Sequence, residues 1–407
     1  MPTALPPTFD RLERHAALPV VDHDDTARFN FLAGLNVSIG ATLSPGVREA
    51  YEHQVRPAFA KQRGRDPANG REIRDAMRGN AFYQSWAALR RSAQEMSQAA
   101  ARGTAVKSLA AVNATVARLN AGKNTLALDP TMSVPAPLAG IDNHLLPGSY
   151  HTELVPDDVT QAATYEMSLF PVAMGSLGAK GDAGGRAAAR WVRARFPKFA
   201  PKRILDLGAG MGGNTLPLAE AFPEAEVVAY DAAAPLLRYG HARAQAMGYS
   251  GVHFVQGLIE DLDPTKHGSF DWVHTTMVWH ETSTSTVSTG LARIHSVLNP
   301  GGLTTHVEQP NFTADTPLFD RFLRNWDAWY NNEPFWTKLH RMDMLSELRA
   351  AGFAAGNIFD GGTEADIEPG KYQSWSRLTE RHKHEVAGAD AARDYNGERW
   401  YVFGAWK

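Results

Sequence analysis

Residues 206–213 read Asp-Leu-Gly-Ala-Gly-Met-Gly-Gly, at the end of a short apolar run and directly before a helical pattern. Glycines in such a turn let the backbone bend tightly and approach a bound ligand closely. Roughly twenty residues further on, Asp231 ends the next apolar run, where a carboxylate can hold the two hydroxyls of a ribose. The glycine turn, the helix start and the acidic residue together predict a nucleotide-type site at the carboxyl ends of neighbouring strands.

Strand-like and helix-like segments alternate regularly after Pro201. The strand-like segments are the apolar, β-branched runs 203–207, 226–231, 252–256, 270–276 and 303–308, with closing runs at 354–359 and 399–406. Helical patterns lie between them at 214–221, 235–248, 286–298 and 342–351. This alternation predicts an α/β fold with a mostly parallel sheet that helices cover on both faces.

The first part of the chain has a different pattern. Apolar residues recur at helical spacing over 24–35, 47–59, 73–96 and 105–119, separated by Gly, Pro and Asn. Residues 126–150 are rich in Pro and Gly, which predicts a linker or an irregular loop packed across a cleft. We therefore expect a separate all-helical N-terminal domain over residues 1–150 and a sheet domain over residues 151–407, as the length of 407 residues also favours. The helical domain would cap the cleft or form a homodimer.

Composition narrows the classes of function. Lys and Arg total 41 and Asp and Glu total 44, so the net charge is −3 and no basic surplus favours nucleic acid or an anionic membrane. Cysteine is absent, which excludes disulfides, thiol nucleophiles and thiolate metal sites. No apolar run reaches the roughly 18 residues of a membrane span, and Met1 to Val21 contain no secretory apolar stretch. We expect a soluble, cytoplasmic protein without a nucleic-acid or membrane partner, and a solvated face for the N-terminal arginines Arg71, Arg74, Arg78, Arg90 and Arg91.

Two nucleotide-type ligands fit the glycine turn. Gly208, Gly210 and Gly213 match the dinucleotide pattern G-x-G-x-x-G. Asp206 lies two residues before the first glycine, where a carboxylate would repel a pyrophosphate but attract a cationic amino-acid portion with an ammonium and a sulfonium. This charge argument favours S-adenosylmethionine over NAD, and NAD(P) stays the alternative.

Four segments of the chain resemble, in the same order, those of a known family. Residues 206–212 resemble motif I of the class I (Rossmann-like) S-adenosylmethionine-dependent methyltransferases, and Asp231 matches their second-strand acidic residue. Residues 230–237, 298–302 and 351–353 resemble, in that order, their passage into the second helix and their turns before the fifth and sixth strands. The resemblance spans roughly residues 186–407. It implies a doubly wound, seven-stranded Rossmann-like sheet, S-adenosylmethionine as cofactor and S-adenosylhomocysteine as product.

The resemblance also implies where the cofactor binds. The expected contacts are Asp206, Gly208, Ala209, Gly210, Asn214, Asp231, Ala232, Leu258, Ile259 and Met277. The family often has an acidic residue after the third strand that binds the adenine amino group, but here Leu258 stands at that position. We expect apolar packing from Leu258 and Ile259, with a backbone N–H, to hold the adenine instead, although Glu260 or Asp261 could substitute for the missing acid.

His280 and Glu281 are the candidate catalytic residues. They follow the fourth expected strand, whose end faces the methyl group of the cofactor in this architecture. A histidine has an unperturbed pKa of about 6.5 and can accept the proton of a hydroxyl acceptor, and His280 is similar in position to the base histidine of plant-type O-methyltransferases. The alternative is that His280 caps the next helix or orders the loop. His306 and Glu308 share one face of the fifth strand; we expect His306 to be a core or subsite residue and Glu308 to reach the cleft. His280, His306 and Glu308 could together bind a metal, but because the histidines lack i, i+4 spacing we expect no metal site.

Aromatic and polar residues after the fifth strand predict the acceptor site. Residues 325–336 contain Trp, Tyr, Asn and Glu side chains that could bind an aromatic or apolar acceptor or lie against the sulfonium. The alternative is a helical stripe that packs onto the N-terminal domain. Residues 142–151 could close the cleft or form an ordinary loop, and Tyr165 is similarly placed. The expected acceptor-binding residues are Tyr150, His151, Trp279, Trp326, Tyr330, Asn331 and Glu333.

The sequence therefore predicts an S-adenosylmethionine-dependent methyltransferase that acts on a small organic acceptor, with oxygen as the favoured atom. Transfer to carbon or nitrogen fits the same cofactor site. The rivals from other classes are an NAD(P)-dependent oxidoreductase that uses the same glycine turn and a non-catalytic scaffold that only binds the cofactor.

Overall fold

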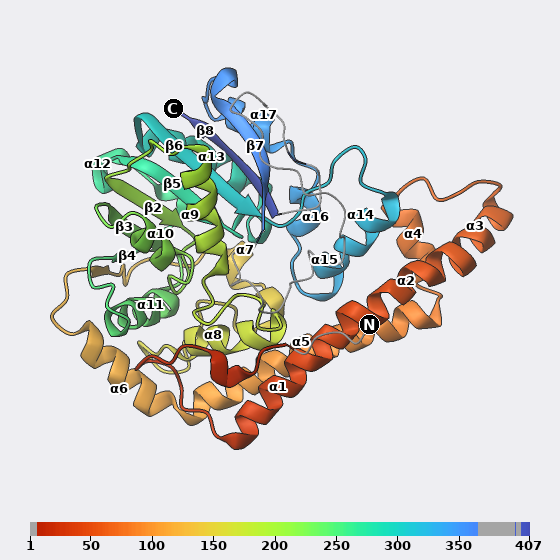
Figure 1. The fold of residues 1–407 in the computed structure, drawn as a ribbon, viewed down its shortest axis with the longest axis horizontal. Helices are drawn as coiled ribbons and strands as arrows, with labels where there is room; N and C mark the ends of the chain where they lie inside the picture. Colours follow the sequence, from red (N-terminus) through yellow and green to blue (C-terminus); the bar gives the residue numbers. More distant parts are fainter. Residues whose placement is uncertain (1–5, 365–394, 396–399) are drawn as a thin grey trace.

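The fold is built around one sheet of eight strands (Figure 1). The structure, a computed structural model, describes residues 6–364, 395 and 400–407. The strands are β1 (Leu126–Ala127), β2 (Arg203–Leu207), β3 (Glu226–Asp231), β4 (His253–Gln256), β5 (Phe270–Thr276), β6 (Leu298–Glu308), β7 (Ile358–Thr363) and β8 (Trp400–Trp406). Their order is β1-β4-β3-β2-β5-β6-β8-β7, and the pairings are parallel except for the two that β8 makes. The expected mostly parallel α/β sheet is confirmed.

Helices cover both faces of this sheet. On β2, β3 and β5, neighbouring residues point into opposite apolar cores, as the two-residue period of a strand requires. Ile204, Val227 and Trp272 pack with α9 (Ala183–Arg195) and α10 (Thr215–Ala221), whereas Leu205, Val228 and Val273 pack with α13 (Thr284–Val297) and α17 (Met344–Ala350). The sheet is therefore doubly wound, with near-continuous apolar strands at its centre.

β2 lies at the centre of the sheet, with β3 on one side and β5 on the other. The chain first builds outward through β3 and β4, and it then crosses back to add β5 and β6 on the opposite side. In sheets of this kind a crevice forms at the carboxyl ends of the strands where the order reverses. Here these ends carry Leu207, Asp231, Thr276 and Glu308, and the turns that follow them hold most of the predicted site residues.

The sheet has one strand more than the seven expected from the sequence. The additional strand β1 has two residues and pairs in parallel with β4 at the edge of the sheet, with Leu126 opposite Phe254. Two residues are too few for a periodic pattern, and they lie in the segment 126–150 that was expected to be irregular. The strand expected at 354–359 begins later, at Ile358, because residues 355–357 form a 3-10 turn. Arg399, expected to begin the last strand, lies outside the described residues.

The N-terminal region is helical, as expected. Its helices are α1 (His23–Ser38), α2 (Ser44–Ala50), α3 (Arg56–Arg63), α4 (Gly70–Met77), α5 (Ala81–Lys107) and α6 (Leu109–Asn120). Two π-helical segments, Ile39–Leu43 and Tyr51–Val55, join α1, α2 and α3, and each comes just before a proline. Because proline has no N–H for the carbonyl four residues back, a wider turn accommodates the missing bond. The single helix expected over 73–96 is wrong: the Asn80 side chain accepts the Tyr83 N–H and starts α5 as a new helix.

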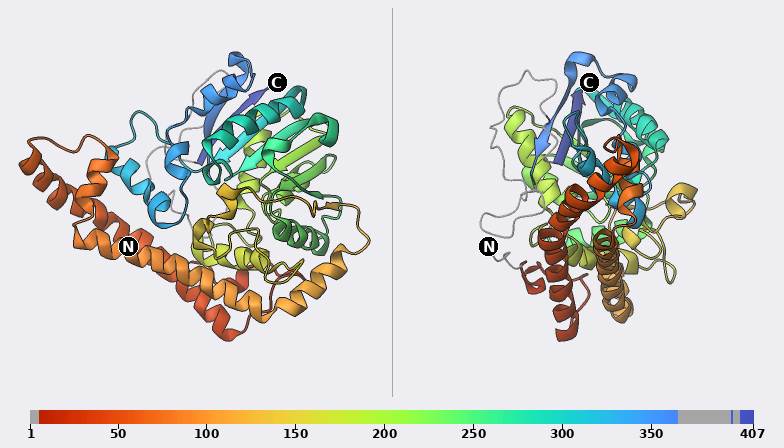
Figure 2. Two further views of the ribbon diagram at one scale, coloured as in Figure 1. Left: turned by 180° about the vertical axis from the view of Figure 1, so that it is seen from behind. Right: turned by 90° about the vertical axis from the view of Figure 1, so that its right-hand side faces the viewer.

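The long helices α1 and α5 run side by side along one side of the sheet and extend beyond it (Figure 2). α5 packs against α8 (Thr160–Val172), α6 against α11 (Ala234–Ala246), and α4 against α14 (Leu318–Arg324). The remaining helices are short: α7 (Ala136–Ala139), α12 (Pro264–His267), α15 (Trp326–Tyr330) and α16 (Trp336–Leu339). Among the described helices, none combines the length and the apolar character needed to cross a membrane. The domain boundary near residue 150 stays a prediction.

Candidate active site

A cavity of about 970 Å³ lies at the carboxyl ends of the central strands, between the sheet and the N-terminal helices. Most of the predicted site residues line it: Tyr150, His151, Gly208, Ala209, Gly210, Asn214, Asp231, Ala232, Leu258, Ile259, Met277, His280, Glu281, Trp326, Asn331 and Glu333. Asp206, Trp279 and Tyr330 belong to the described residues but do not line the cavity. The fold thus brings cofactor, catalytic and acceptor candidates to one place.

The turn after β2 has the conformation that its glycines permit. Gly208, Gly210 and Gly212 have φ angles of 66°, 54° and 78°, in the left-handed region that residues with a Cβ rarely adopt. A Cβ on Gly208 would come within 2.6 Å of the Val278 side chain, whereas a Cβ on Gly210 would meet nothing closer than a Leu236 carbon at 4.0 Å. The backbone at Gly210 therefore faces open cavity space, which a ligand can approach closely.

Asp231 ties this turn to the end of β3. Its two carboxylate oxygens accept the backbone N–H groups of Gly210 and Ala233, each at 2.8 Å. Burial raises the pKa of the Asp231 carboxyl, while these two hydrogen bonds lower it. Each carboxylate oxygen has a further lone pair, and Asp231 lines the cavity, so it can accept hydrogen bonds from a ligand with hydroxyl groups.

Asp206 lies behind the glycine turn instead of in the cavity wall. Its side chain is 1% exposed and accepts a hydrogen bond from Thr215 Oγ1 at 2.5 Å. Burial raises the pKa of Asp206 to about 7, although the bond from Thr215 opposes the shift. Asn214, next to Thr215, does line the cavity, and its Oδ1 accepts the Gly185 N–H at 2.8 Å. Any influence of Asp206 on a ligand is therefore electrostatic and acts through the turn.

The turn after β4 forms an apolar wall with Leu258 and Ile259. Gly257 fits here because a Cβ would come within 2.0 Å of the Tyr230 hydroxyl, which donates to Leu258 O at 3.2 Å. Glu260, a possible substitute for the missing acidic residue, is bound through its side chain by Thr286 at 2.7 Å. The hydrogen bond from the Tyr230 hydroxyl to the backbone of Leu258 thus helps to hold Leu258 and Ile259 in place.

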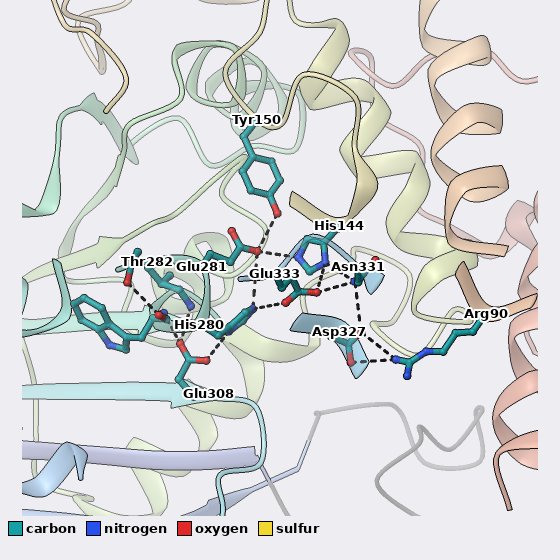
Figure 3. Close-up of polar contacts among 12 residues, drawn as sticks. Arg90, His144, Tyr150, His280, Glu281, Thr282, Glu308, Asp327, Asn331 and Glu333 are labelled. Carbon is teal, nitrogen blue, oxygen red and sulfur yellow. Dashed lines mark hydrogen bonds and ion pairs between the residues drawn. The ribbon is translucent and has the colours of Figure 1, made fainter. Parts of the chain in front are cut away.

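His280 forms a buried pair with Glu308 at the end of β5. Its Nδ1 lies 2.7 Å from Glu308 Oε2, and Glu308 Oε1 accepts the backbone N–H groups of Val278 and Trp279 at 2.9 and 2.6 Å. Burial alone would lower the pKa of His280, but the negative charges of Glu308, Glu281 and Glu333 outweigh it and raise the pKa to about 9. The pairing at Nδ1 leaves His280 Nε2 directed at Glu281 and Glu333 (Figure 3).

His144 extends this network from the other side of the cavity (Figure 3). Its Nε2 lies 2.8 Å from Glu281 Oε1 and its Nδ1 lies 3.0 Å from Glu333 Oε1. The Tyr150 hydroxyl donates to the same Glu281 oxygen at 3.0 Å. Sequence reasoning selected Tyr150 and His151 from this segment and missed His144. Its only local signal is its place in the polar sequence Asp142-Asn143-His144, because its partners lie far along the chain.

Arg90 corrects the expectation that the N-terminal arginines form a solvated face. It pairs with Asp327 at 3.1 Å, stacks over the Trp326 ring at 4.0 Å and lines the cavity. Asn331 links this pair to the histidine network, since its Nδ2 donates to Glu333 Oε1 at 2.7 Å and lies 3.5 Å from Asp327 Oδ1. A continuous polar chain therefore runs from Arg90 to Glu308 along the cavity (Figure 3).

In the aromatic segment after β6, some residues line the cavity, as an acceptor site predicts, and others pack on the N-terminal helices. Trp326 packs edge-on against Trp86 of α5, with ring centroids 6.0 Å apart, and also lines the cavity. Tyr330 packs on Trp326 and stays outside the cavity wall, as a stripe facing the N-terminal helices predicts. Trp279 is fully buried in the core beneath α13, which removes it from direct contact with an acceptor.

His306 takes the core position expected for it. It is fully buried and hydrogen-bonded to Thr275 and Thr304 at 2.9 and 3.0 Å. Burial lowers its pKa well below the usual value. Glu308, two residues on, reaches the site through His280.

Comparisons with known proteins find similar sequences and structures. Residues 204–302 match a sequence family described as a methyltransferase domain. An uncharacterised methyltransferase from Synechocystis sp. is 32% identical over 166 residues, which are 40% of this chain and 72% of that protein. Trans-aconitate 2-methyltransferase from Deinococcus radiodurans is 34% identical over 245 residues, which are 53% of this chain and 88% of that protein. An O-methyltransferase family protein from Burkholderia thailandensis has a solved structure that is 12% identical, with a TM-score of 0.40 over 61% of this chain and 60% of that chain.

Proposed function

The chain belongs to the class I S-adenosylmethionine-dependent methyltransferases, and from that premise we propose that it methylates a hydroxyl oxygen of a small organic acceptor. The observation that carries the proposal is the His280–Glu308 pair. It stands at the end of β5, and its second imidazole nitrogen, Nε2, is directed away from Glu308 toward cavity-lining carboxylates. A base at this position is what transfer to a hydroxyl needs and what transfer to an already nucleophilic atom does not.

The residues of the cavity fit S-adenosylmethionine. The backbone at Gly210 borders open space where the ligand would approach it, and the half-buried Asp231 carboxylate offers lone pairs to the ribose hydroxyls. Leu258 and Ile259 provide an apolar wall for the adenine. When bound, the cofactor supplies a methyl group that its positive sulfur activates. The protein then has to align the acceptor, exclude water and remove the hydroxyl proton.

Glu308 determines which nitrogen of His280 can act. As the pH rises through the pKa of about 9, His280 becomes neutral; its remaining proton stays on Nδ1, where Glu308 Oε2 accepts it, and the lone pair on Nε2 is free for the acceptor hydroxyl. The carboxylates of Glu281 and Glu333 lie 3.9 Å from Nε2 and stabilise the imidazolium that forms when the proton arrives. Aromatic side chains of Trp86, Trp326 and Trp336 line the same cavity and favour an acceptor with an aromatic or extended apolar body.

The size of the cavity supports a two-ligand site. Its volume of about 970 Å³ lies at the upper end of the range of about 300–1,000 Å³ for ligand pockets. Residues 1–150 would act as a cap, because α5 contributes Arg90 and Gln94 to the cavity wall. The segment before α8 contributes His144 and Tyr150 to the same wall. Acceptor access would then pass between this cap and the sheet.

The test is methyl transfer from S-adenosylmethionine to a panel of phenols, enols, alcohols, amines and carbon acids, followed by mass spectrometry of product and S-adenosylhomocysteine. We expect products with the methyl group on oxygen, and a loss of transfer in His280→Gln. His53→Gln, on an exposed N-terminal helix, is the matched control and should retain full activity. Products methylated only on carbon or nitrogen, or cofactor binding without turnover on any acceptor, would contradict the proposal.

A further inference from the structure

Two histidines on opposite sides of the cavity face one carboxylate oxygen. His144 Nε2 lies 2.8 Å and His280 Nε2 lies 3.9 Å from Glu281 Oε1, and the three atoms all lie within 4.8 Å of one another. Glu333 Oε2 lies beside this group, 3.9 Å from His280 Nε2. The Glu333 side chain is 2% exposed, and this oxygen has no hydrogen-bond partner among the described residues. Two imidazole nitrogens and one carboxylate oxygen therefore converge at one point, with the Glu333 carboxylate beside them (Figure 3).

Each histidine is held by a carboxylate on the nitrogen that faces away from this point. Glu308 Oε2 lies 2.7 Å from Nδ1 of His280, and Glu333 Oε1 lies 3.0 Å from Nδ1 of His144. Metal-binding histidines carry this arrangement, because a carboxylate on the far nitrogen fixes the tautomer and leaves Nε2 as the donor. Its occurrence on both histidines is a second observation that points to a cation.

The backbone at the site is also in an uncommon conformation. His144, Met277 and Asn332 have φ angles of 54°, 58° and 54°, in the left-handed region that non-glycine residues rarely adopt. His144 is a member of the cluster, Asn332 precedes Glu333, and Met277 begins the turn that leads to His280. Such conformations persist where the surrounding structure holds a functional geometry in place.

We propose that His144, His280 and Glu281 bind one divalent transition-metal ion of the Zn²⁺ type in the acceptor half of the cavity. Imidazole nitrogens favour Zn²⁺ and its neighbours over Mg²⁺ and Ca²⁺, which prefer all-oxygen sites. Bonds of about 2.0–2.1 Å in a tetrahedral site place the ligand atoms about 3.3 Å apart. The two histidine nitrogens now lie 2.8 and 3.9 Å from Glu281 Oε1, and all three atoms lie within 4.8 Å of one another, so side-chain movements bring them to that spacing.

The sequence expectation of no metal rested on spacing along the chain. The three side chains come from the segment before α8 and the turn after β5, so no local sequence motif predicts them. His306, considered earlier as a ligand with His280 and Glu308, hydrogen-bonds to threonines in the core and takes no part.

A bound ion would regulate the reaction proposed above, and this consequence rests on that proposed function. The ion and the acceptor proton compete for one lone pair, that of His280 Nε2. A metal-loaded molecule therefore lacks the base, and Zn²⁺ should suppress methyl transfer to hydroxyl acceptors. The binding itself does not depend on which reaction the protein catalyses.

The test is calorimetric titration of Zn²⁺ and of Mg²⁺ into the full chain, without a tag and without cofactor or acceptor, with the bound metal counted after dialysis. We expect one Zn²⁺ per chain and no Mg²⁺ binding. His144→Ala and Glu281→Gln should each weaken Zn²⁺ binding at least tenfold, the smallest effect usual even for residues that only support a metal ligand. His53→Ala removes the exposed His53–Glu49 pair, 3.1 Å apart, and should change nothing.

Circular dichroism checks that the variants fold, and the visible spectrum of Co²⁺ bound to the unmutated protein gives a readout that needs no variant. Absorption bands typical of nitrogen and oxygen ligands at low coordination number would support the site. Absence of Zn²⁺ binding, unchanged affinity in folded His144→Ala and Glu281→Gln, loss in His53→Ala, or a Co²⁺ spectrum like that of the hydrated ion would each overturn it. Because no methyl transfer is measured, failure of this proposal and failure of the proposed function are separate results.

Discussion

Glu308 Oε2 accepts a hydrogen bond of 2.7 Å from His280 Nδ1, while the other oxygen of the same carboxylate accepts two backbone N–H groups. The backbone thus fixes the carboxylate, and the carboxylate fixes the imidazole. This relationship decides which nitrogen of His280 faces the cavity. It is the structural basis of the base role proposed for His280.

Glu308→Gln tests that relationship. The amide oxygen can still accept the two backbone N–H groups, but the charge that supports a protonated His280 is lost. We expect kcat for methyl transfer to fall about 100-fold, the lower end of the effect of general-base catalysis, with cofactor affinity unchanged. Steady-state kinetics with an acceptor from the panel measure this. Glu347→Gln, on the surface of α17, is the matched control, and an equal loss there would contradict the assignment.

Gly210 and Gly122 form a matched pair for the glycine turn. Both have left-handed φ angles, 54° and 68°, and neither has a neighbour closer than 4.0 Å to an added Cβ. Alanine should therefore cost each about 1–2 kcal/mol of stability through backbone strain. Only Gly210 lines the cavity, so only Gly210→Ala should lose cofactor affinity, by at least tenfold. Thermal melts and cofactor titration measure the two effects, and equal cofactor affinity in both variants would place the ligand elsewhere.

Asp206 makes the free energy of unfolding depend on pH. Burial raises its pKa from 3.8 to about 7, so between these values the folded chain holds a proton that the unfolded chain has lost. Stability contributed by this group therefore falls as pH rises from about 4 to 7, by about 4 kcal/mol at most. Asp206→Asn should stabilise the cofactor-free protein at pH 8 and gain little at pH 4, as urea unfolding can measure. A variant less stable than the unmutated protein at pH 8 would contradict the buried-charge account.

Glu166 makes the free energy of unfolding depend on pH in the opposite direction. Burial alone would raise its pKa, but the charges of Arg243 and His15 outweigh burial and lower the pKa from 4.5 to about 2. The stability from this group is complete above about 4.5 and is lost as pH falls toward 2. Glu166→Gln should cost about 3 kcal/mol at neutral pH, with a smaller cost at acid pH. Urea unfolding at several pH values measures this, with Glu347→Gln as the control, and a cost independent of pH would rule out the ion pairs as its cause.

The central strands and the glycine turn could be predicted because their signals are local. The runs 203–207, 226–231 and 270–276 are apolar enough to be read directly, and the strands have those bounds. β1 could not be predicted, because two residues carry no period and its pairing with β4 forms across more than a hundred residues of chain. The π-helical segments likewise depend on proline positions within an otherwise ordinary helical pattern.

The site residues likewise fall into those that local sequence signals could place and those that they could not. Asp231, Gly210 and His280 follow strands at positions that the α/β architecture determines, so sequence reasoning could place them. His144 and Arg90 join the site through contacts with Glu281 and Asp327, 137 and 237 residues away. No pattern within either segment encodes such a partner. Asp206 shows the reverse case, since it lies in β2 just before the glycine turn, but its side chain turns into the core toward Thr215.

The most direct test of the account is calorimetric titration of S-adenosylmethionine, S-adenosylhomocysteine and NADH into the protein and into Asp231→Asn. The asparagine keeps an oxygen for the Gly210 or Ala233 N–H but loses the charge that we propose binds the ribose hydroxyls. We expect micromolar binding of the two adenosyl compounds, a loss of at least tenfold in Asp231→Asn, as expected for hydrogen bonds to a charged group, and no binding of NADH. Binding of NADH alone, or equal affinity for S-adenosylmethionine in both proteins, would contradict it.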